Sequence, residues 1–423
     1  MRLIYFLLAL QLPACLCQSP ATILLHTINF LAIGLGGVMM VPAIQSMMPK
    51  GDKIETVVRI GVGESWDRFG KRLNLGGNTP DVRIFDSAGR SIGKKANDKW
   101  LAVEGNFHDL SIKPEDERSS GNRHGEYLSV SANGNNAICI AYVAVTWTDD
   151  QNKLWLGNWG AECGGAWYHS NLAISDDSFV PKCTWIDQDF SNNIKAQGIG
   201  IHITDFGATA ARVRQFNDDR SLVCDSKPRF HLYDRLHVDM PIPFFYPPLE
   251  FNPDGTDKDV HKVKVRGKIR PLKCELLLPD REYRGPKHCG RPTDDTVIFD
   301  RRRSVDDIEE ATDETHDVPP VATNSTRPVV PFMEGRLVTS KRHSAAELCE
   351  SPSSRGADFV SHAEGMFCDM TAKHLWPLCS EAKPDACFDV KTYTMRPGKG
   401  LHGRDESSGR PVPNKLYMRT VHW

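Results

Sequence analysis

The sequence predicts a mainly β protein: an antiparallel β-sandwich or jelly roll, then a disordered charged linker, then a small disulfide-rich module of helix and coil. Short strand-like segments bounded by turn residues recur from residue 56 to residue 206, without a long stretch of helical periodicity. Ten of the twelve cysteines lie beyond the apolar N-terminus, and the last four fall in a polar C-terminal stretch that needs covalent support. These observations place the sandwich over 51–240 and the Cys-rich module over 344–423.

The expected strands follow one another at the spacing of an antiparallel all-β domain. The run 137–145 is apolar on both faces, which predicts a strand at the centre of a sheet. The pair Asn133-Gly134 before it tolerates the positive φ of a hairpin turn. In chain order the expected strands are 56–62, 82–85, 101–103, 110–112, 127–131, 137–145, 153–156 and 198–203.

Two apolar segments open the chain. Residues 1–17 carry one arginine, an apolar core and small residues near the end, which is the layout of a secretory signal peptide. The segment 18–50 contains a second apolar run, 22–44, of membrane-spanning length and without charge. This run is either removed, which we favour, or retained as an anchor. The protein is then extracellular in the first case and membrane-anchored in the second.

A secretory leader makes the ten remaining cysteines disulfide candidates. No Cys-x-x-Cys pair occurs, so the spacing of a zinc finger is absent and no metal site is expected. The spacing leaves the connectivity open. The candidates are Cys139, Cys163, Cys183, Cys224, Cys274, Cys289, Cys349, Cys368, Cys379 and Cys387.

Two segments join the sandwich to the C-terminal module. Residues 241–290 form a stiff Pro-rich extension that is expected to pack on the sandwich. Residues 291–343 are a charged linker whose low hydrophobicity cannot offset chain entropy. The linker carries the only glycosylation sequon, at Asn324, and dibasic pairs that end at Arg303 and Arg342 as processing sites.

The module 344–423 is expected to combine short helices with coil. Capping-box sequences begin at Ser344 and Ser361, and each predicts the start of a helix. The two helices would carry Cys349 and Cys368. Two disulfides could then support a module this small and polar.

Tryptophans concentrate between residues 147 and 185, interleaved with amides and carboxylates. Flat indole faces beside such groups suit sugar rings, which need apolar stacking and hydrogen bonds. The alternative is ordinary core packing, with Cys163 and Cys183 closing a loop. The candidate ligand-binding residues are Trp155, Trp159, Trp167, Tyr168, Asn158 and Glu162.

Sequence signals for catalysis are weak. No Gly-x-Ser-x-Gly, P-loop or dinucleotide-binding glycine motif occurs, so no cofactor is expected. Glu162, Asp187 and Asp205 are candidate carboxylates for glycoside hydrolysis only through their proximity to the aromatic residues. His202 lacks metal-ligand spacing and is interpreted as structural. The net charge of −2 gives no basic field for nucleic acid.

Motifs in both halves of the chain carry a family resemblance. They are 73–80 (LNLGGNTP), 103–109 (VEGNFHD), 137–146 with 155–160, 358–361, 366–370 and 387–390. Together they resemble a family of uncharacterised secreted proteins of filamentous ascomycete fungi, over most of 56–423. The resemblance implies an extracellular fungal protein. The family has no known activity, so no residue role follows from it.

We therefore expect a secreted, non-catalytic protein that binds a glycan or another cell-surface ligand on its sandwich. One alternative is a secreted hydrolase that acts on polysaccharide with paired carboxylates. Another is a proprotein that releases its Cys-rich module after dibasic cleavage. No nucleic-acid partner is expected, and membrane contact is expected only if 22–44 is retained.

Overall fold

The computed structural model describes residues 28–34, 37–43, 45–96, 99–115, 124–174, 179–265, 333–400, 403–406 and 408–423. It also describes the backbone of two short strands that pair with each other, β16 (Lys268–Ile269) and β17 (Val297–Ile298). The predicted signal peptide, Cys274, Cys289, Arg303 and Asn324 lie outside the described residues.

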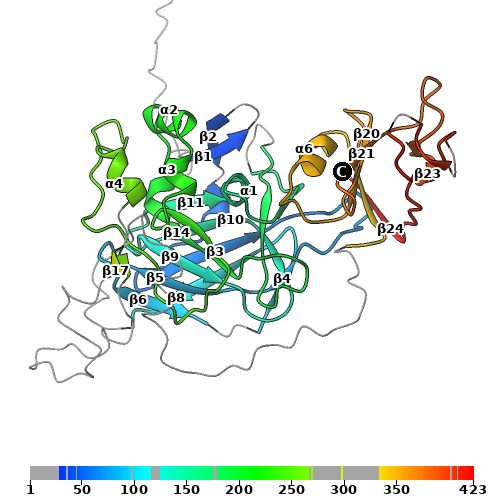
Figure 1. Cartoon of the computed structure of the whole chain (residues 1–423). Helices are drawn as coiled ribbons and strands as arrows, with labels where there is room; N and C mark the ends of the chain where they lie inside the picture. Colours follow the sequence, from blue (N-terminus) through cyan, green and yellow to red (C-terminus); the bar gives the residue numbers. More distant parts are fainter. Residues whose placement is uncertain are drawn as a thin grey trace, which may run out of the picture.

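Two antiparallel sheets make up most of the larger part of the molecule (Figure 1). Side chains from both sheets form one apolar core. The first sheet has the order β12 (Trp167–Tyr168), β13 (Cys183–Ile186), β10 (Ile138–Thr146), β3 (Thr56–Val62) and β8 (Phe107–Ile112), with β11 (Asn152–Leu156) paired to β10. The second has the order β15 (Phe230–Tyr233), β14 (Gly198–His202), β9 (Tyr127–Ser131), β5 (Asp81–Phe85) and β6 (Ser91–Lys95). The predicted mainly β, antiparallel fold is confirmed.

Every strand expected from the sequence is present, but the turn at Asn133-Gly134 does not join two paired strands. Strand β10 is central and buried on both faces, with Ile140 and Val143 between the two sheets and Ala141 and Ala144 in a second core. Gly134 has the expected positive φ of 90°. The expected hairpin is nevertheless wrong, because β9 and β10 belong to different sheets. The expected strand 101–103 is β7 (Leu101–Ala102), which pairs with β4 (Gly77–Asn78) outside both sheets.

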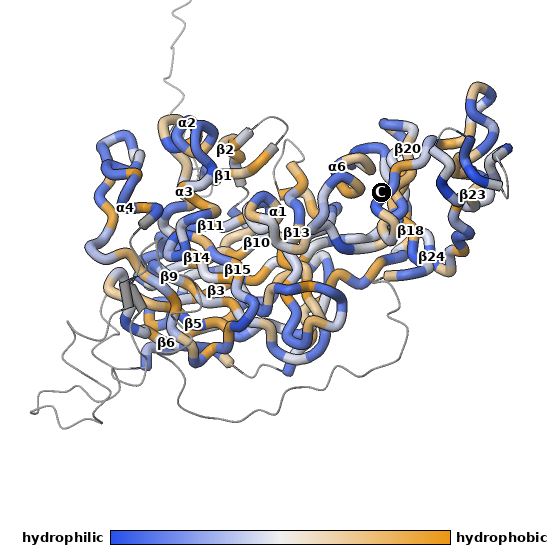
Figure 2. Tube along the Cα trace, in the orientation of Figure 1, coloured by the Kyte–Doolittle hydropathy of each residue, from blue (hydrophilic) through white to orange (hydrophobic). Residues whose placement is uncertain are grey.

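The second apolar segment is part of the fold. Its residues form an antiparallel hairpin, β1 (Ile28–Gly34) and β2 (Gly37–Ala43), which Figure 2 shows as a hydrophobic pair beside α2 (Ala210–Asp218). Phe30 and Leu31 are fully or almost fully buried in the two cores. Residues 28–34 and 37–43 are therefore strands of the fold rather than the helix that a membrane anchor would form. The glycines at the centre of the run favour a turn between two strands over one continuous helix.

Short helices and the Pro-rich segment pack around the two sheets. They are η2 (Gln45–Met47), α1 (Asn158–Glu162), η4 (Ile203–Phe206), α2, α3 (Ser221–Cys224) and α4 (Val260–Val265). From the Pro-rich segment, Phe244 and Phe245 enter the core between the sheets, and the amide of Phe245 donates to Tyr127 Oη over 3.0 Å.

A buried ion cluster joins η4 to the segments that carry Arg229 and Asp257. The guanidinium of Arg229, which has no exposed surface, donates to Asp205 over 2.7 Å and to Asp257 over 2.6 Å. His202 Nδ1 lies 2.7 Å from Asp205 Oδ2. Burial alone would raise the pKa of Asp205, but Arg229 and His202 reverse this and hold that pKa well below its usual value. The charges in this cluster are paired, which fits a structural role for His202 and Asp205.

The C-terminal module is built mainly of strands. Its sheet has the order β21 (His374–Pro377), β20 (Met366–Asp369), β19 (Asp358–Ser361), β18 (Arg336–Ser340) and β24 (Arg419–His422), beside α6 (Ala345–Glu350) and a hairpin of β22 (Cys387–Asp389) and β23 (Thr394–Arg396). The expected description of the module as helix and coil is therefore wrong in part. Strand β18 lies within the range 291–343 of the predicted linker. A cut after Arg342 would break the chain between β18 and both strands that pair with it, β19 and β24.

The two predicted capping boxes have different outcomes. Ser344 caps α6 as expected, because its Oγ accepts from the amide of Glu347 over 3.0 Å. The helix expected at Ser361 is wrong, since that residue ends β19 and the chain turns into β20. Glu364 in this turn accepts instead from the amide of Ala345 over 2.7 Å. Its carboxylate thus satisfies a donor at the start of α6 that the helix leaves open.

Four disulfides lie within the described residues. They join Cys139 to Cys183, Cys163 to Cys224, Cys349 to Cys368 and Cys379 to Cys387. The loop expected between Cys163 and Cys183 is not closed, because each of these cysteines pairs elsewhere. Disulfides in this number suggest an extracellular or secreted protein. Within the same residues, no helix has the length and apolar character required to cross a membrane.

The hairpin gives a direct stability test. Replacement of Phe30, fully buried, by Ala is expected to lower the free energy of unfolding by about 3–5 kcal/mol, because it leaves a cavity between β1 and the sandwich. Met40→Ala on the same hairpin is the control, since that side chain is 44% exposed and its loss is expected to change stability by about 0.5 kcal/mol or less. Urea unfolding at neutral pH measures both. Equal stability of the two variants would contradict the placement of the hairpin.

Candidate functional site

The aromatic residues predicted to bind a ligand are buried. Three of the four rings have no exposed surface and the fourth is 2% exposed, so a sugar ring cannot stack on them. Asn158 is 4% exposed, and Glu162 forms an ion pair with Arg220. The core-packing alternative therefore describes this cluster. The four rings are those of Trp155, Trp159, Trp167 and Tyr168.

Two predicted residues hold the N-terminal hairpin on the sandwich. Asn158 Nδ2 donates to the carbonyl of Ile33 and Trp159 Nε1 donates to that of Leu31, each over 3.1 Å. The Trp159 ring also meets Phe206 edge-on, with ring centroids 6.0 Å apart. The start of α1 thus anchors β1.

The other aromatic residues of the cluster dock the C-terminal module. Tyr168 Oη donates to the carbonyl of Ala357 over 2.9 Å, and Trp185 Nε1 donates to that of Arg355 over 3.0 Å. Trp167 Nε1 reaches Ser351 Oγ over 2.9 Å. The C-terminal module therefore covers the surface that these aromatic residues form.

A glycine permits the close contact at this junction. A Cβ added to Gly356 would lie 2.2 Å from Cδ2 of Tyr168. The loop that precedes β19 can therefore lie directly against the tyrosine ring only because it carries no side chain at that position.

Two buried histidines cross the junction in opposite directions. His169 of the sandwich lies 3.0 Å from the carbonyl of Ser344, and His343 of the module lies 3.0 Å from the carbonyl of Ser170. The distances join Nε2 to the carbonyl oxygen in both cases. Burial lowers the pKa of each histidine to about 3, so both rings are neutral at neutral pH.

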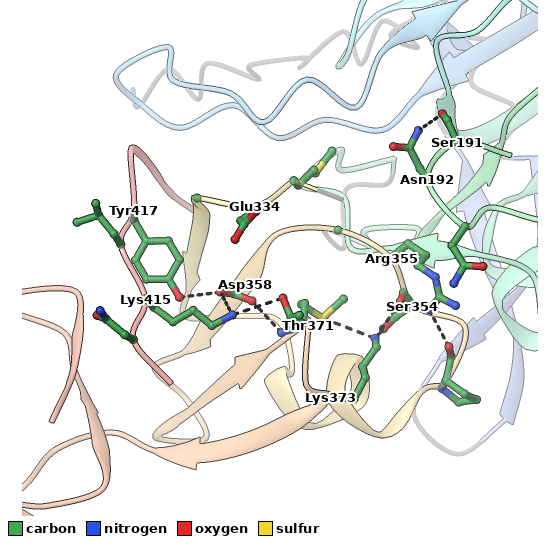
Figure 3. A pocket seen from close by; sticks show the side chains of 18 residues that line it. Ser191, Asn192, Glu334, Ser354, Arg355, Asp358, Thr371, Lys373, Lys415 and Tyr417 are labelled. Atoms are coloured by element: carbon green, nitrogen blue, oxygen red, sulfur yellow. Dashed lines mark hydrogen bonds and ion pairs between the residues drawn. The ribbon is translucent and has the colours of Figure 1, made fainter. Parts of the chain in front are cut away.

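A pocket of about 420 Å³ opens where the module meets the sandwich (Figure 3). The sandwich contributes Ser191, Asn192 and Asn193 from the loop after β13. Asp187, which is fully buried, holds this loop through Asn192 Nδ2 at 3.2 Å. The rest of the lining comes from four segments of the module, 333–335, 352–358, 370–373 and 414–417.

One wall of the pocket carries a carboxylate that is fully engaged. Asp358 accepts from Tyr417 Oη over 2.7 Å and from the amide of Met370 over 2.8 Å, and Lys415 Nζ lies 3.0 Å away. Lys415 also binds Asp369 over 2.7 Å. Burial raises the pKa of Asp358. Burial would lower the pKa of Lys415, but the two carboxylates raise it above its usual value.

The opposite wall carries two cations. Lys373 Nζ donates to the carbonyls of Leu348 and Ser354 over 3.1 and 2.9 Å, and also to Ser354 Oγ. Burial, and then the neighbouring charge of Arg355, lower the pKa of Lys373 to about 8. Arg355 Nη1 donates to the carbonyls of Pro352 and Ser354. Within the described residues, no carboxylate forms an ion pair with Arg355 or Lys373, so this wall favours an anion.

The carboxylates predicted for hydrolysis are not gathered at this pocket. Glu162 is paired with Arg220, Asp205 lies in the ion cluster of the sandwich, and Asp187 supports the loop behind Asn192. Among the residues that the structure describes, no group of three His, Cys, Asp or Glu side chains is placed to hold a metal ion.

Sequence reasoning missed the pocket because its lining is spread from residue 191 to residue 417. Arg355 and Lys373 stand in ordinary polar stretches, where a charged residue is usually solvated. Models of known protein families and curated proteins were compared with the chain, and neither comparison gives a match. What the pocket can bind is therefore inferred from the residues that line it.

The two junction histidines predict a loss of stability in acid. Their pKa is about 3 in the folded protein against 6.5 unfolded, so as the pH falls from about 6.5 towards 3 only the unfolded chain takes up the protons. Each histidine is expected to lower the unfolding free energy by up to about 1.4 kcal/mol per pH unit in this window. Urea unfolding between pH 7 and pH 4 measures the slope. His343→Gln should flatten it, whereas the exposed His261→Gln should not; equal slopes for both variants would contradict this account.

The pairing of Lys415 with two carboxylates predicts a loss of stability when this lysine is replaced. Lys415→Met leaves Asp358 and Asp369 without their cation and is expected to lower the unfolding free energy by about 3 kcal/mol. Lys383→Met, on an exposed lysine of the same module, is the matched control. An unchanged urea midpoint for Lys415→Met would show that the two carboxylates do not depend on this charge.

Proposed function

We propose that this is a secreted, non-catalytic binding protein that holds an acidic sugar, alone or at the end of a glycan, in the pocket between the sandwich and the C-terminal module. The observation that carries the proposal is the pair of cations, Arg355 and Lys373, without a carboxylate partner among the described residues. Like charges kept close together in a partly buried wall repel each other. A bound anion would remove that repulsion.

The arginine is suited to a carboxylate. Within the described residues, Arg355 makes its hydrogen bonds through Nη1 alone, which leaves the Nε and Nη2 edge for a ligand. An arginine edge binds a carboxylate through two parallel hydrogen bonds. Lys373 donates three hydrogen bonds to the protein, so it contributes charge rather than a further contact.

Several of the remaining lining residues suit hydroxyl groups, and they stand beside one further carboxylate, that of Glu334. Asn192 and Asn414 offer amide donors and acceptors, and Ser191 and Thr371 offer hydroxyls. A volume of about 420 Å³ falls in the range of roughly 300–1,000 Å³ that small-molecule sites occupy. A sugar that carries a carboxylate presents both kinds of group at once.

Secretion is part of the proposal. The four disulfides and the predicted leader over 1–17 support it. The resemblance to secreted fungal proteins points in the same direction and stays a prediction. The function expected from the sequence is kept, whereas its site moves from the buried tryptophans to the pocket.

The test uses ligands that differ only in the carboxylate. On an array of paired uronic-acid and neutral glycans, the protein is expected to bind the acidic members, and calorimetry with the best pair gives the affinities. Arg355→Ala should weaken acidic binding at least about tenfold, because one charge-assisted pair is lost. Arg342→Ala, on an exposed arginine of the same module, should bind as the parent does. Equal binding of neutral and acidic partners, no binding at all, or full retention in Arg355→Ala would each refute the proposal.

A further inference from the structure

A second surface of the sandwich exposes an unusual number of large apolar side chains. They lie on the loop after β3, on the loop that contains β7, and at the start of β8, and each is between 40% and 71% exposed. Single exposed apolar residues are common, but a group on neighbouring loops marks an interaction site. We call this group the apolar patch; it consists of Trp66, Phe69, Trp100, Leu101, Val103 and Phe107.

Buried contacts hold the two loops of the patch together. The carboxylate of Glu104, which is 1% exposed, accepts from Ser65 Oγ over 2.6 Å and from the amides of Asn74 and Leu75 over 3.0 and 2.8 Å. The backbone of Gly105 donates to Gly63 over 3.0 Å. The patch is thus carried by a fixed framework in which Glu104 links the loop of Trp100 to the loop of Trp66.

The first loop also reaches the second through Trp66 itself. A Cβ added to Gly105 would lie 3.4 Å from Trp66 Nε1 and 3.1 Å from Cγ of Glu64. Gly105 has a φ of 69°, which favours glycine. The indole of Trp66 therefore lies beside the turn that follows Val103.

Cations accompany the aromatic rings. The guanidiniums of Arg72, Arg68 and Arg59 lie over the rings of Trp66, Phe69 and Phe107, at 5.2, 4.7 and 3.5 Å from the ring centroids. Arg68, Lys71 and Lys99 are exposed, and none of them forms an ion pair with a carboxylate of the described chain. Arg59 forms an ion pair with Asp109 over 2.6 Å, and Arg72 lies 3.9 Å from Glu104, so among the described residues the unpaired positive charge beside the apolar side chains comes from Arg68, Lys71 and Lys99.

The composition of the patch indicates the kind of partner. Leu101 and Val103 are aliphatic and are 60% and 44% exposed, and exposed cations lie on the same two loops. A sugar ring stacks on flat aromatic faces, whereas aliphatic side chains gain from burial in lipid, whose anionic headgroups complement the cations.

We propose that the apolar patch is a membrane-binding surface, which docks the protein peripherally on a bilayer that contains anionic phospholipid. Trp66 and Trp100 lie at the level of the headgroups, where indole rings are favoured. Leu101, Val103 and Phe69 enter the acyl boundary. The cations Arg68, Lys71 and Lys99 meet the anionic headgroups. This inference is independent of the pocket and goes beyond the proposed function.

Vesicle flotation with the full chain tests this. The protein is expected to float with vesicles of phosphatidylcholine and phosphatidylserine and much less with phosphatidylcholine alone, and added salt should weaken the binding. Trp100→Ala with Leu101→Ala should weaken it at least about tenfold, because one indole at the headgroup level and one inserted aliphatic side chain are lost. Phe251→Ala with Val260→Ala, at exposed apolar residues elsewhere on the sandwich, should bind as the parent does. Circular dichroism checks that both double variants are folded.

The outcomes separate this proposal from the pocket. Arg355→Ala should float like the parent, and the Trp100 and Leu101 double variant should keep its affinity for acidic glycans. Absence of flotation, equal flotation with both kinds of vesicle, or equal loss in the two double variants would overturn the membrane surface. Binding of the patch to an insoluble polysaccharide but to no vesicle would overturn it as well and assign the surface to a glycan.

Discussion

The junction between the strands β12 and β13 and the loop 351–357 determines the rest of the site. Trp167, Tyr168 and Trp185 each donate one hydrogen bond to this loop, from rings that are buried. The same loop continues into the pocket wall at Arg355 and Asp358. The bonds that dock the module thus also set the position of the cations relative to Asn192 of the sandwich.

Two clusters of charged residues differ in a way that makes one of them structural and the other a candidate site. Around Arg229, each buried charge faces an opposite charge and the cluster is closed to solvent. Such a network holds segments together and has little left to offer a ligand. Around Arg355 and Lys373, the positive charges have no carboxylate partner in the described chain and face an open pocket. Burial raises the free energy that it takes to hold these two cations close together, and a bound anion would lower it.

Some features could be predicted because neighbouring residues decide them. The strand Thr56–Val62 has the ends that its sequence indicates, and β10 is central because its residues are apolar at every position. The capping of α6 by Ser344 needs only Glu347, three residues away. The abundance of cysteine likewise indicated disulfides without indicating their pairs.

Other features depend on contacts between distant parts of the chain, and there the sequence alone was insufficient. The burial of Tyr168 follows from Ala357, 189 residues further on, and that of Trp159 from a hairpin 128 residues earlier. The same apolar run suits a helix or a hairpin until a core is present to cover it. The sequence by itself determined the local elements, the class of fold and the presence of disulfides. Only the tertiary structure decided which aromatic rings are buried and which charges meet in a pocket, because burial and charge pairing are properties of the assembled chain.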